Sequence, residues 1–333
     1  MNTKYFADII GHDQIRQALQ RAFAHGRVAH AYLFSGAEAI GKYKTALAFA
    51  RMLQCTCGAE SGVRCLACDL PAGQAHPDIT TVLPQGATIR LEQIREIQKD
   101  LPYQPRAGKQ KIYILDGVER LTEQAANSLL KMLEEPPAYV VFILLTVNTY
   151  SVLPTILSRC QHLSFQAVPA EDIAAYLREH GCQEEQAAIV AAVSGGIPGR
   201  ALLWAEGGYQ LRDQVIHCLE DLKHASPGKV WDTVALLNQE REQILITLEL
   251  IAHVVRDCLV WKATGNRELL LYKDCTARIA ALTEKAALDG LLAMYKELTA
   301  ARQMFLGNAN SRLLWEKICL RIQDALAEQK ESC

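Results

Sequence analysis

Residues 30–43 read HAYLFSGAEAIGKY, an apolar run followed by a glycine-rich loop and a lysine. Gly36, Gly41 and Lys42 fit the spacing G-x-x-x-x-G-K directly after a strand-like run, Ala31–Ser35, and directly before a helical pattern. In this arrangement backbone N–H groups surround phosphates, the lysine reaches the outer ones, and the helix N-terminus favours anions. The pattern therefore predicts a nucleotide-binding loop of the P-loop type.

Two positions differ from an active phosphate loop. A Ser or Thr normally follows the lysine because its hydroxyl ligates Mg²⁺, and Tyr43 stands there, too bulky for that role. Asp116 ends a second apolar strand and suits a metal, but Gly117 follows where a glutamate would orient the attacking water. We expect no hydrolysis and no Mg²⁺ site. Weak binding of ATP or ADP, and a loop retained for its shape alone, both remain open.

Short apolar runs alternate with helical patterns in the first half of the chain. The runs are residues 31–35, 79–83, 111–115, 140–145 and 162–165, and the helical patterns are 43–53, 91–101, 122–134 and 152–157. Such alternation predicts a parallel sheet with helices on both faces. After Val168 only helical spacing remains, in stripes that begin at Leu211, Ile244 and Leu314. The expected fold class is α/β followed by all-α.

Composition indicates a cytoplasmic globular protein. The chain has 333 residues, which is too long for a single hydrophobic core. Its residues are 50% apolar and 22% charged, as is usual for a globular protein. The sequence contains no run of 18 apolar residues and no secretory signal. A net charge of −2 argues against a stand-alone nucleic-acid binder. Residues 86–111 are locally basic, with six Lys or Arg against three Asp or Glu. Arg95 and Lys99 there either face DNA phosphates or belong to a solvated helix.

Four of the eleven cysteines are clustered as Cys55-x-Cys57-x₇-Cys65-x₂-Cys68 in a glycine-containing insert. Four thiolates at such spacing suit a closed tetrahedral Zn²⁺ site, which would be structural because no open position is needed. Free cysteines in a reducing compartment are the alternative. We expect a structural zinc ion that orders the insert.

Several motifs occur in a fixed order along the chain. They are HAYLFSG (30–36), the cysteine insert, HPD (76–78), NSLLKMLEEPP (127–137) and LPTILSRC (153–160). Together they resemble the bacterial clamp-loader family of AAA+ proteins, and within it the delta-prime subunits. One departure is Gly62, which stands where the family has a cysteine, so that Cys57 takes its place.

The resemblance implies an architecture and partners. It implies an AAA+ domain at residues 1–167 with a zinc insert at about 55–68, a small helical lid at 168–207, and a helical oligomerisation collar at 208–333. Implied partners are the tau/gamma and delta subunits in a ring, and through the ring the sliding clamp and primed DNA. No membrane is involved.

The resemblance also assigns roles to single residues. Arg159 in Ser-Arg-Cys matches a trans-acting arginine finger, which stabilises charge on a neighbour's γ-phosphate. Arg200 matches a lid arginine that contacts nucleotide, and Asn148 matches a polar sensor at a strand end. From the residues alone, Arg159 is equally a surface arginine, and Arg200 and Asn148 are structural if the pocket is empty.

Four functions compete on this sequence. The first is a stator that hydrolyses nothing and supplies Arg159 to its neighbour; the second is an active ATPase motor of the tau/gamma type, which Tyr43 and Gly117 oppose. A polymerase or nuclease lacks the clustered carboxylates that hold two metals. A zinc-binding scaffold outside replication is the last.

Overall fold

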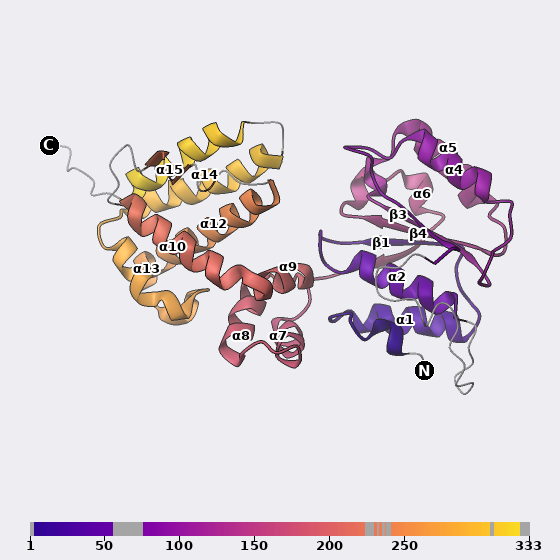
Figure 1. Cartoon of the computed structure of the whole chain (residues 1–333), viewed down its shortest axis with the longest axis horizontal. Coiled ribbons are helices and arrows are strands. Elements are labelled where there is room, and N and C mark those ends of the chain that lie inside the picture. Colours follow the sequence, from indigo (N-terminus) through magenta and orange to yellow (C-terminus); the bar gives the residue numbers. More distant parts are fainter. Residues whose placement is uncertain are drawn as a thin grey trace. The chain divides into compact units, whose positions relative to one another are not determined.

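A computed structural model describes residues 3–55, 76–223, 230–231, 233–234, 237, 241–306 and 310–326. The chain divides into two compact units, Met1–Leu202 and Leu203–Cys333. The first holds a sheet and its helices, and the second is helical in its described part (Figure 1). The α/β and all-α parts predicted from the sequence are therefore confirmed. The three-domain division expected at residues 1–167, 168–207 and 208–333 stays a prediction.

Five parallel strands form the sheet of the first unit in the order β2-β3-β4-β1-β5. They are β1 (Ala31–Ser35), β2 (Ile79–Val82), β3 (Lys111–Asp116), β4 (Val140–Thr146) and β5 (Gln161–Ser164). The central strands β1 and β4 are buried along their whole length, which explains their unbroken apolar sequences. The strand predictions are confirmed to within a residue or two.

Helices cover both faces of the sheet (Figure 1). On one face lie α1 (Asp13–Ala24) and α2 (Lys42–Leu53), preceded by the short helix η1 (Thr3–Phe6). On the other lie α4 (Leu91–Asp100), α5 (Glu123–Glu134) and α6 (Pro154–Leu157). Short 3₁₀ turns η2 (Val118–Arg120) and η3 (Thr149–Ser151) follow β3 and β4, and α7 (Ala170–Glu179), α8 (Glu184–Val193) and α9 (Pro198–Leu203) follow β5.

The second unit packs amphipathic helices around one another. After a π-helical turn, η4 (Trp204–Gly208), they are α10 (Tyr209–Lys223), α12 (Arg241–Thr264), α13 (Thr276–Thr283), α14 (Leu288–Leu306) and α15 (Ser311–Leu326), with 3₁₀ turns η5 (Arg267–Leu269) and η6 (Lys273–Cys275) between α12 and α13. Each predicted stripe is mainly buried, as Val215, Ile251 and Ile322 illustrate. Among the described helices, none is long and apolar enough to cross a membrane.

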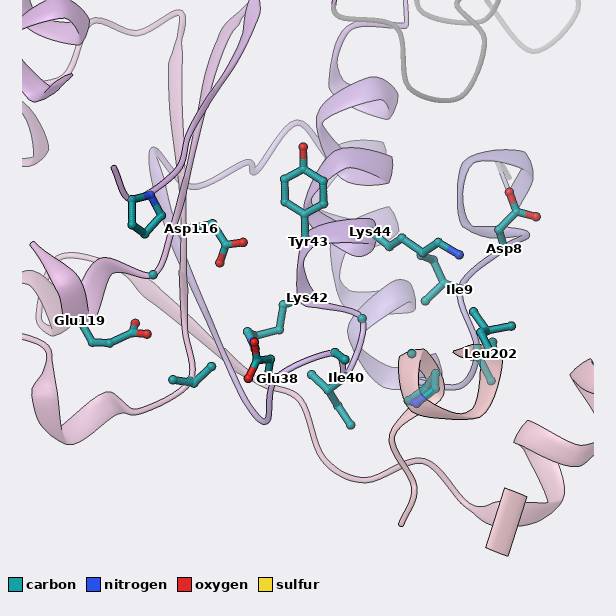
Figure 2. Close-up of a pocket in the computed structure, with 18 of the residues that line it drawn as sticks. Asp8, Ile9, Glu38, Ile40, Lys42, Tyr43, Lys44, Asp116, Glu119 and Leu202 are labelled. Atoms are coloured by element: carbon teal, nitrogen blue, oxygen red, sulfur yellow. The ribbon is translucent and has the colours of Figure 1, made fainter. Parts of the chain in front are cut away.

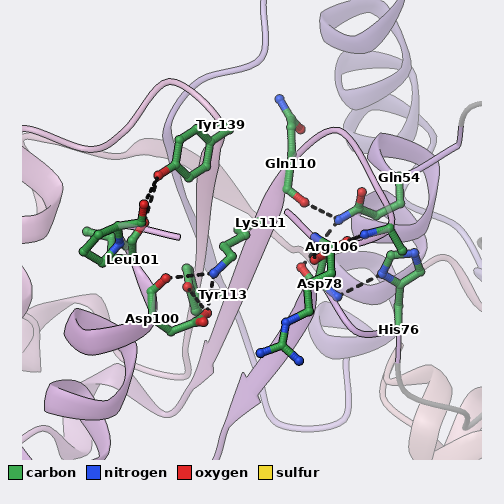
Figure 3. A network of polar contacts seen from close by, with 12 residues as sticks. Gln54, His76, Asp78, Asp100, Leu101, Arg106, Gln110, Lys111, Tyr113 and Tyr139 are labelled. Carbon is green, nitrogen blue, oxygen red and sulfur yellow. Dashed lines mark hydrogen bonds and ion pairs between the residues drawn. The ribbon is translucent and has the colours of Figure 1, made fainter. Parts of the chain in front are cut away.

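A polar network lies at the edge of the sheet, between the end of α2, the start of β2 and the loop before β3 (Figure 3). Asp78, which is 3% exposed, accepts hydrogen bonds from the backbone N–H groups of Arg106, Ala107 and Gly108 at 2.6, 2.8 and 2.7 Å. The Gln54 side chain donates to the carbonyl of Gln110. These bonds join the end of α2 and the start of β2 to the loop that precedes β3.

Candidate functional site: a phosphate loop with altered catalytic positions

The predicted phosphate loop connects β1 to α2. Gly36, Ala39 and Gly41 all have positive φ angles, of 151°, 59° and 110°, and Gly41 is the residue before the first turn of α2. The loop therefore has the strand-loop-helix setting that the sequence predicts.

The ammonium of Lys42 is bonded to the loop itself. Its Nζ donates to the carbonyl oxygens of Gly36 and Ala37 at 2.7 and 2.8 Å, and the residue is 7% exposed. Burial lowers the pKa of Lys42, and the charge of the nearby Asp116 carboxylate opposes that shift. A phosphate would have to compete with these two carbonyls for the lysine.

Two further segments bond to the same loop. His12 places Nε2 2.9 Å from the Ile40 carbonyl, and the N–H of Gly199 donates to the Ala39 carbonyl at 3.0 Å. A Cβ on Gly199 would lie only 2.8 Å from Ala39, so this close approach requires glycine. The loop is thus joined to the start of α1 and to α9.

A cavity of about 390 Å³ opens beside the loop (Figure 2). It is lined by residues of the loop and of α2, by Asp8–Ile10, by Asp116, Gly117, Glu119 and Arg120 at and after the end of β3, and by Pro198, Gly199 and Leu202. Figure 2 shows Asp116 and Glu119 on one side of Lys42, and Asp8 and Leu202 on the other. An N-terminal segment, the phosphate loop, the acidic strand end and α9 therefore meet at one cavity.

The acidic side of the cavity differs from that of a hydrolytic site. Burial raises the pKa of Asp116, which Lys42 partly offsets. Gly117 has a φ of +80°, and a Cβ there would meet the Pro84 ring at 3.3 Å. Glu119 is the nearest acid beyond it: its side chain is 11% exposed, and in the described part of the chain its Oε2 has no hydrogen-bond partner.

Tyr43 lines the cavity from the first turn of α2, where it is 40% exposed. Figure 2 shows its ring extending from the start of α2 in a different direction from the Lys42 side chain. The position of the metal-binding hydroxyl is thus taken by an aromatic ring.

Two predicted nucleotide contacts, Asn148 and Arg200, do not line this cavity, and their contact with nucleotide stays a prediction. Asn148 does not line this cavity; its Oδ1 accepts the N–H of Tyr150 and its Nδ2 donates to Ser151, both at 3.0 Å, so that it caps η3. Arg200 follows Gly199 in α9 but is absent from the cavity lining. The sequence interpretation missed His12, Asp8 and Gly199, although the Gly-Ile-Pro-Gly turn before Arg200 was a usable signal for the last of these.

Arg159 lies at the surface just after α6, and its side chain is 34% exposed. Its Nη2 donates to the carboxylate of Glu134 at 2.7 Å, and its Nη1 donates to the Thr155 carbonyl at 2.9 Å. The guanidinium is therefore accessible and held by two acceptors.

Three of the predicted zinc ligands, Cys57, Cys65 and Cys68, lie outside the described residues. Cys55 is described and is 7% exposed, directly after the end of α2. Among the residues that the structure describes, no group of three or more His, Cys, Asp or Glu could hold a metal ion. The structure therefore shows no zinc site.

Comparison with known proteins gives consistent matches. The family described as "DNA polymerase III, delta subunit" matches residues 11–169, and "DNA polymerase III, delta subunit, C terminal" matches residues 206–324. The chain is 28% identical to DNA polymerase III subunit delta' of Bacillus subtilis over 317 residues, which is 93% of this chain and 96% of that protein.

Two further comparisons concern a tau subunit and a gamma subunit-related protein. Subunit tau of Salmonella typhimurium is 36% identical over 185 residues, which is 55% of this chain and 28% of tau. A crystal structure of a DNA polymerase III gamma subunit-related protein from Thermotoga maritima shares the fold, with a TM-score of 0.52 and 21% identity over 92% of this chain and 99% of that one. The chain belongs to the DNA polymerase III delta-prime subunit family of AAA+ clamp-loader proteins.

Proposed function

We propose that this chain is a non-hydrolysing stator of a DNA polymerase III clamp loader. In this role it assembles with the tau/gamma ATPase and with delta, and it helps the ring to load a sliding clamp onto primed DNA. Residues 1–167 form the AAA+ domain, residues 168–207 a lid and residues 208–333 a collar. The observation that carries the proposal is a folded phosphate loop beside a left-handed Gly117 and an aromatic Tyr43.

The backbone at Gly117 opposes hydrolysis. A residue with a side chain is strained at a φ of +80°, so a water-orienting glutamate does not fit there without rearrangement. Tyr43 offers no small hydroxyl to Mg²⁺, and Lys42 already bonds two carbonyls. Weak binding of ATP or ADP remains compatible with the cavity, since Gly41, Lys42 and Asp116 line it and Gly36 begins the same loop.

One observation favours an active motor of the tau/gamma type instead. Glu119 lines the cavity, and its unpartnered oxygen is the kind of group that could orient water. Subunit tau of Salmonella typhimurium is also 36% identical over 55% of this chain. Turnover by the purified chain separates the two hypotheses.

Arg159 is the residue we propose to act on a neighbouring subunit. A guanidinium supplied in trans stabilises the charge of the phosphoryl-transfer transition state and is worth about 10³–10⁵ in rate. Its exposure, and its placement at the end of a one-turn helix in the Ser-Arg-Cys motif, support this role.

A structural Zn²⁺ held by Cys55, Cys57, Cys65 and Cys68 is part of the proposal and rests on cysteine spacing. Elemental analysis of the purified chain should give about one zinc per chain, because four thiolates complete a tetrahedral site. A folded preparation with less than a tenth of that amount would refute it.

The main test measures ATP turnover by the chain alone and with tau/gamma and delta, with and without primed DNA. We expect no turnover alone and stimulated turnover in the complex. Arg159→Ala should lower the stimulated rate at least about tenfold without loss of assembly. Arg178→Ala is the matched control, because Arg178 is another surface arginine 2.7 Å from a glutamate, Glu184. Sustained turnover by the chain alone would favour the motor, and a normal rate with Arg159→Ala would remove the arginine finger.

A further inference from the structure

We propose that Glu134 is the positioning residue for Arg159, and that it acts together with the Thr155 carbonyl to aim the guanidinium out of the surface. The proposal rests on the trans-acting role of Arg159 proposed above. Glu134 is the last residue of α5, in the Leu-Glu-Glu-Pro-Pro sequence, and lies 25 residues before Arg159 in the chain. Nothing in its sequence position alone links it to the arginine.

In the described part of the chain, the two terminal nitrogens of the Arg159 guanidinium are hydrogen-bonded, and Nε is not. Glu134 Oε1 accepts from Nη2 at 2.7 Å, and the Thr155 carbonyl accepts from Nη1 at 2.9 Å, with Ser158 Oγ 3.4 Å from the same nitrogen. A guanidinium carries five N–H bonds. The Nε–H and one Nη2 hydrogen have no acceptor among the described residues, so they remain available to phosphate oxygens.

Both acceptors are fixed to one core. Leu133, beside Glu134, is 1% exposed, and Ile156, beside Thr155, is also 1% exposed. These two side chains belong to the same hydrophobic cluster on the α4–α5–α6 face of the sheet. The backbone of Arg159 is bonded in turn to the Ile156 carbonyl at 3.1 Å. The backbones of Glu134, Thr155 and Arg159 are therefore anchored to one core, and the ion pair itself holds the exposed carboxylate against the guanidinium.

The Glu134–Arg159 ion pair is exposed, so its loss can affect the position of the guanidinium without much effect on folding stability. The Glu134 side chain is 51% exposed and that of Arg159 is 34% exposed, and exposed ion pairs contribute little to folding. Loss of the carboxylate is therefore expected to leave the chain folded but to free the guanidinium to sample other rotamers. An arginine that must meet a phosphate within hydrogen-bond distance loses rate when its placement is lost.

The test uses the full complex with tau/gamma, delta and primed DNA, and compares kcat and KM for ATP. Glu134→Ala should lower kcat about tenfold while KM for ATP changes less than twofold, because Arg159 acts in the transition state and not in nucleotide binding. Glu134→Gln keeps an amide oxygen that can accept from Nη2, so it should retain at least half of the wild-type kcat. Glu135→Ala is the matched control and should match the wild type, because Glu135 is the adjacent exposed glutamate and, among the described residues, Arg159 bonds Glu134, Thr155 and Ser158 instead.

A double variant shows whether Glu134 acts through Arg159. Glu134→Ala combined with Arg159→Ala should be no slower than Arg159→Ala alone. A wild-type kcat for Glu134→Ala, or rate losses that multiply in the double variant, would overturn the positioning role while leaving the finger in place. A wild-type kcat for Arg159→Ala would instead overturn the finger, and the positioning role with it.

Discussion

Replacing Asp78 with alanine removes the acceptor of three backbone N–H groups that lie 28 to 30 residues further along the chain. Two of them, those of Ala107 and Gly108, share Oδ2, and that of Arg106 bonds Oδ1. A hydrogen bond to a charged group contributes about 1.5–3 kcal/mol. Because Arg106 and Ala107 are exposed and water can replace part of what they lose, we expect Asp78→Ala to cost about 3 kcal/mol.

The isosteric variant separates the charge from the shape. An asparagine has one carbonyl oxygen, which can serve the two N–H groups that share Oδ2, while its NH₂ faces the N–H of Arg106. Asp78→Asn should therefore destabilise by about 1.5 kcal/mol, roughly half the effect of alanine. Asp172→Asn, at an exposed aspartate of α7, is the control and should change stability by less than about 0.5 kcal/mol.

The pH dependence follows from the same contacts. Burial alone would raise the pKa of Asp78, but the three N–H groups outweigh it and the pKa lies below its ordinary value. A group whose pKa is depressed by folding stabilises the protein above its unfolded pKa, near about 4, and the stabilisation is lost as the pH falls through the folded pKa. The difference between wild type and Asp78→Asn should therefore be constant near neutrality and shrink below about pH 4.

The assay must report on the first unit alone. All four tryptophans, Trp204, Trp231, Trp261 and Trp315, lie in the second unit, so their fluorescence in urea serves as an internal reference. Hydrogen exchange of peptides from β2 and β3, measured by mass spectrometry at increasing urea, gives the stability of the sheet edge. The reasoning is refuted if Asp78→Ala changes that stability by less than about 1 kcal/mol, or if Asp78→Asn keeps the wild-type difference at every pH.

Three other perturbations test the site and the second unit. The double variant Tyr43→Thr, Gly117→Glu should not restore ATP turnover, because a glutamate at a φ of +80° is strained. Thermal unfolding should show this strain as a loss of about 1–2 kcal/mol in stability. ATP turnover by the double variant would contradict the backbone argument. Asp257→Ala, at a fully buried carboxylate that accepts two backbone N–H groups, should lower the stability of the second unit by about 3 kcal/mol in urea titrations read by tryptophan fluorescence. Burial raises the pKa of both Cys258 and Cys319 to about 12, so iodoacetamide at pH 8 should label neither until urea unfolds the chain, and rapid native labelling would disprove their burial.

The sheet could be predicted from the sequence because each strand carries its own signal. The runs AYLFS and VVFILL are apolar throughout, as strands buried on both faces must be. The helix α1 has no such signal, since only Ile15 and Leu19 are buried among its twelve residues. The contacts of Asp78 were equally invisible, because their partners are backbone groups far along the chain and carry no residue-type signature.

The residues of the candidate site likewise differ in how much local sequence signal they carry. Gly36, Gly41, Lys42 and Asp116 could be predicted as neighbours because one loop and one strand end carry them, and their binding of nucleotide stays a prediction. Asn148 was placed correctly at the end of a strand, but an asparagine readily hydrogen-bonds its own following backbone, and here it caps η3 instead of facing the cavity.

The contacts of the phosphate loop bear on why such a loop persists in a chain that we propose not to hydrolyse ATP. Lys42, His12 and Gly199 together bond four of its carbonyls, those of Gly36, Ala37, Ala39 and Ile40. The loop, which is the β1–α2 connection, is therefore held by protein groups and joined to two other segments, the start of α1 and α9. Substitution of the hydrolytic residues leaves every one of these bonds intact, because neither Tyr43 nor Gly117 takes part in them. Loss of hydrolysis at this site is thus separable from loss of the fold.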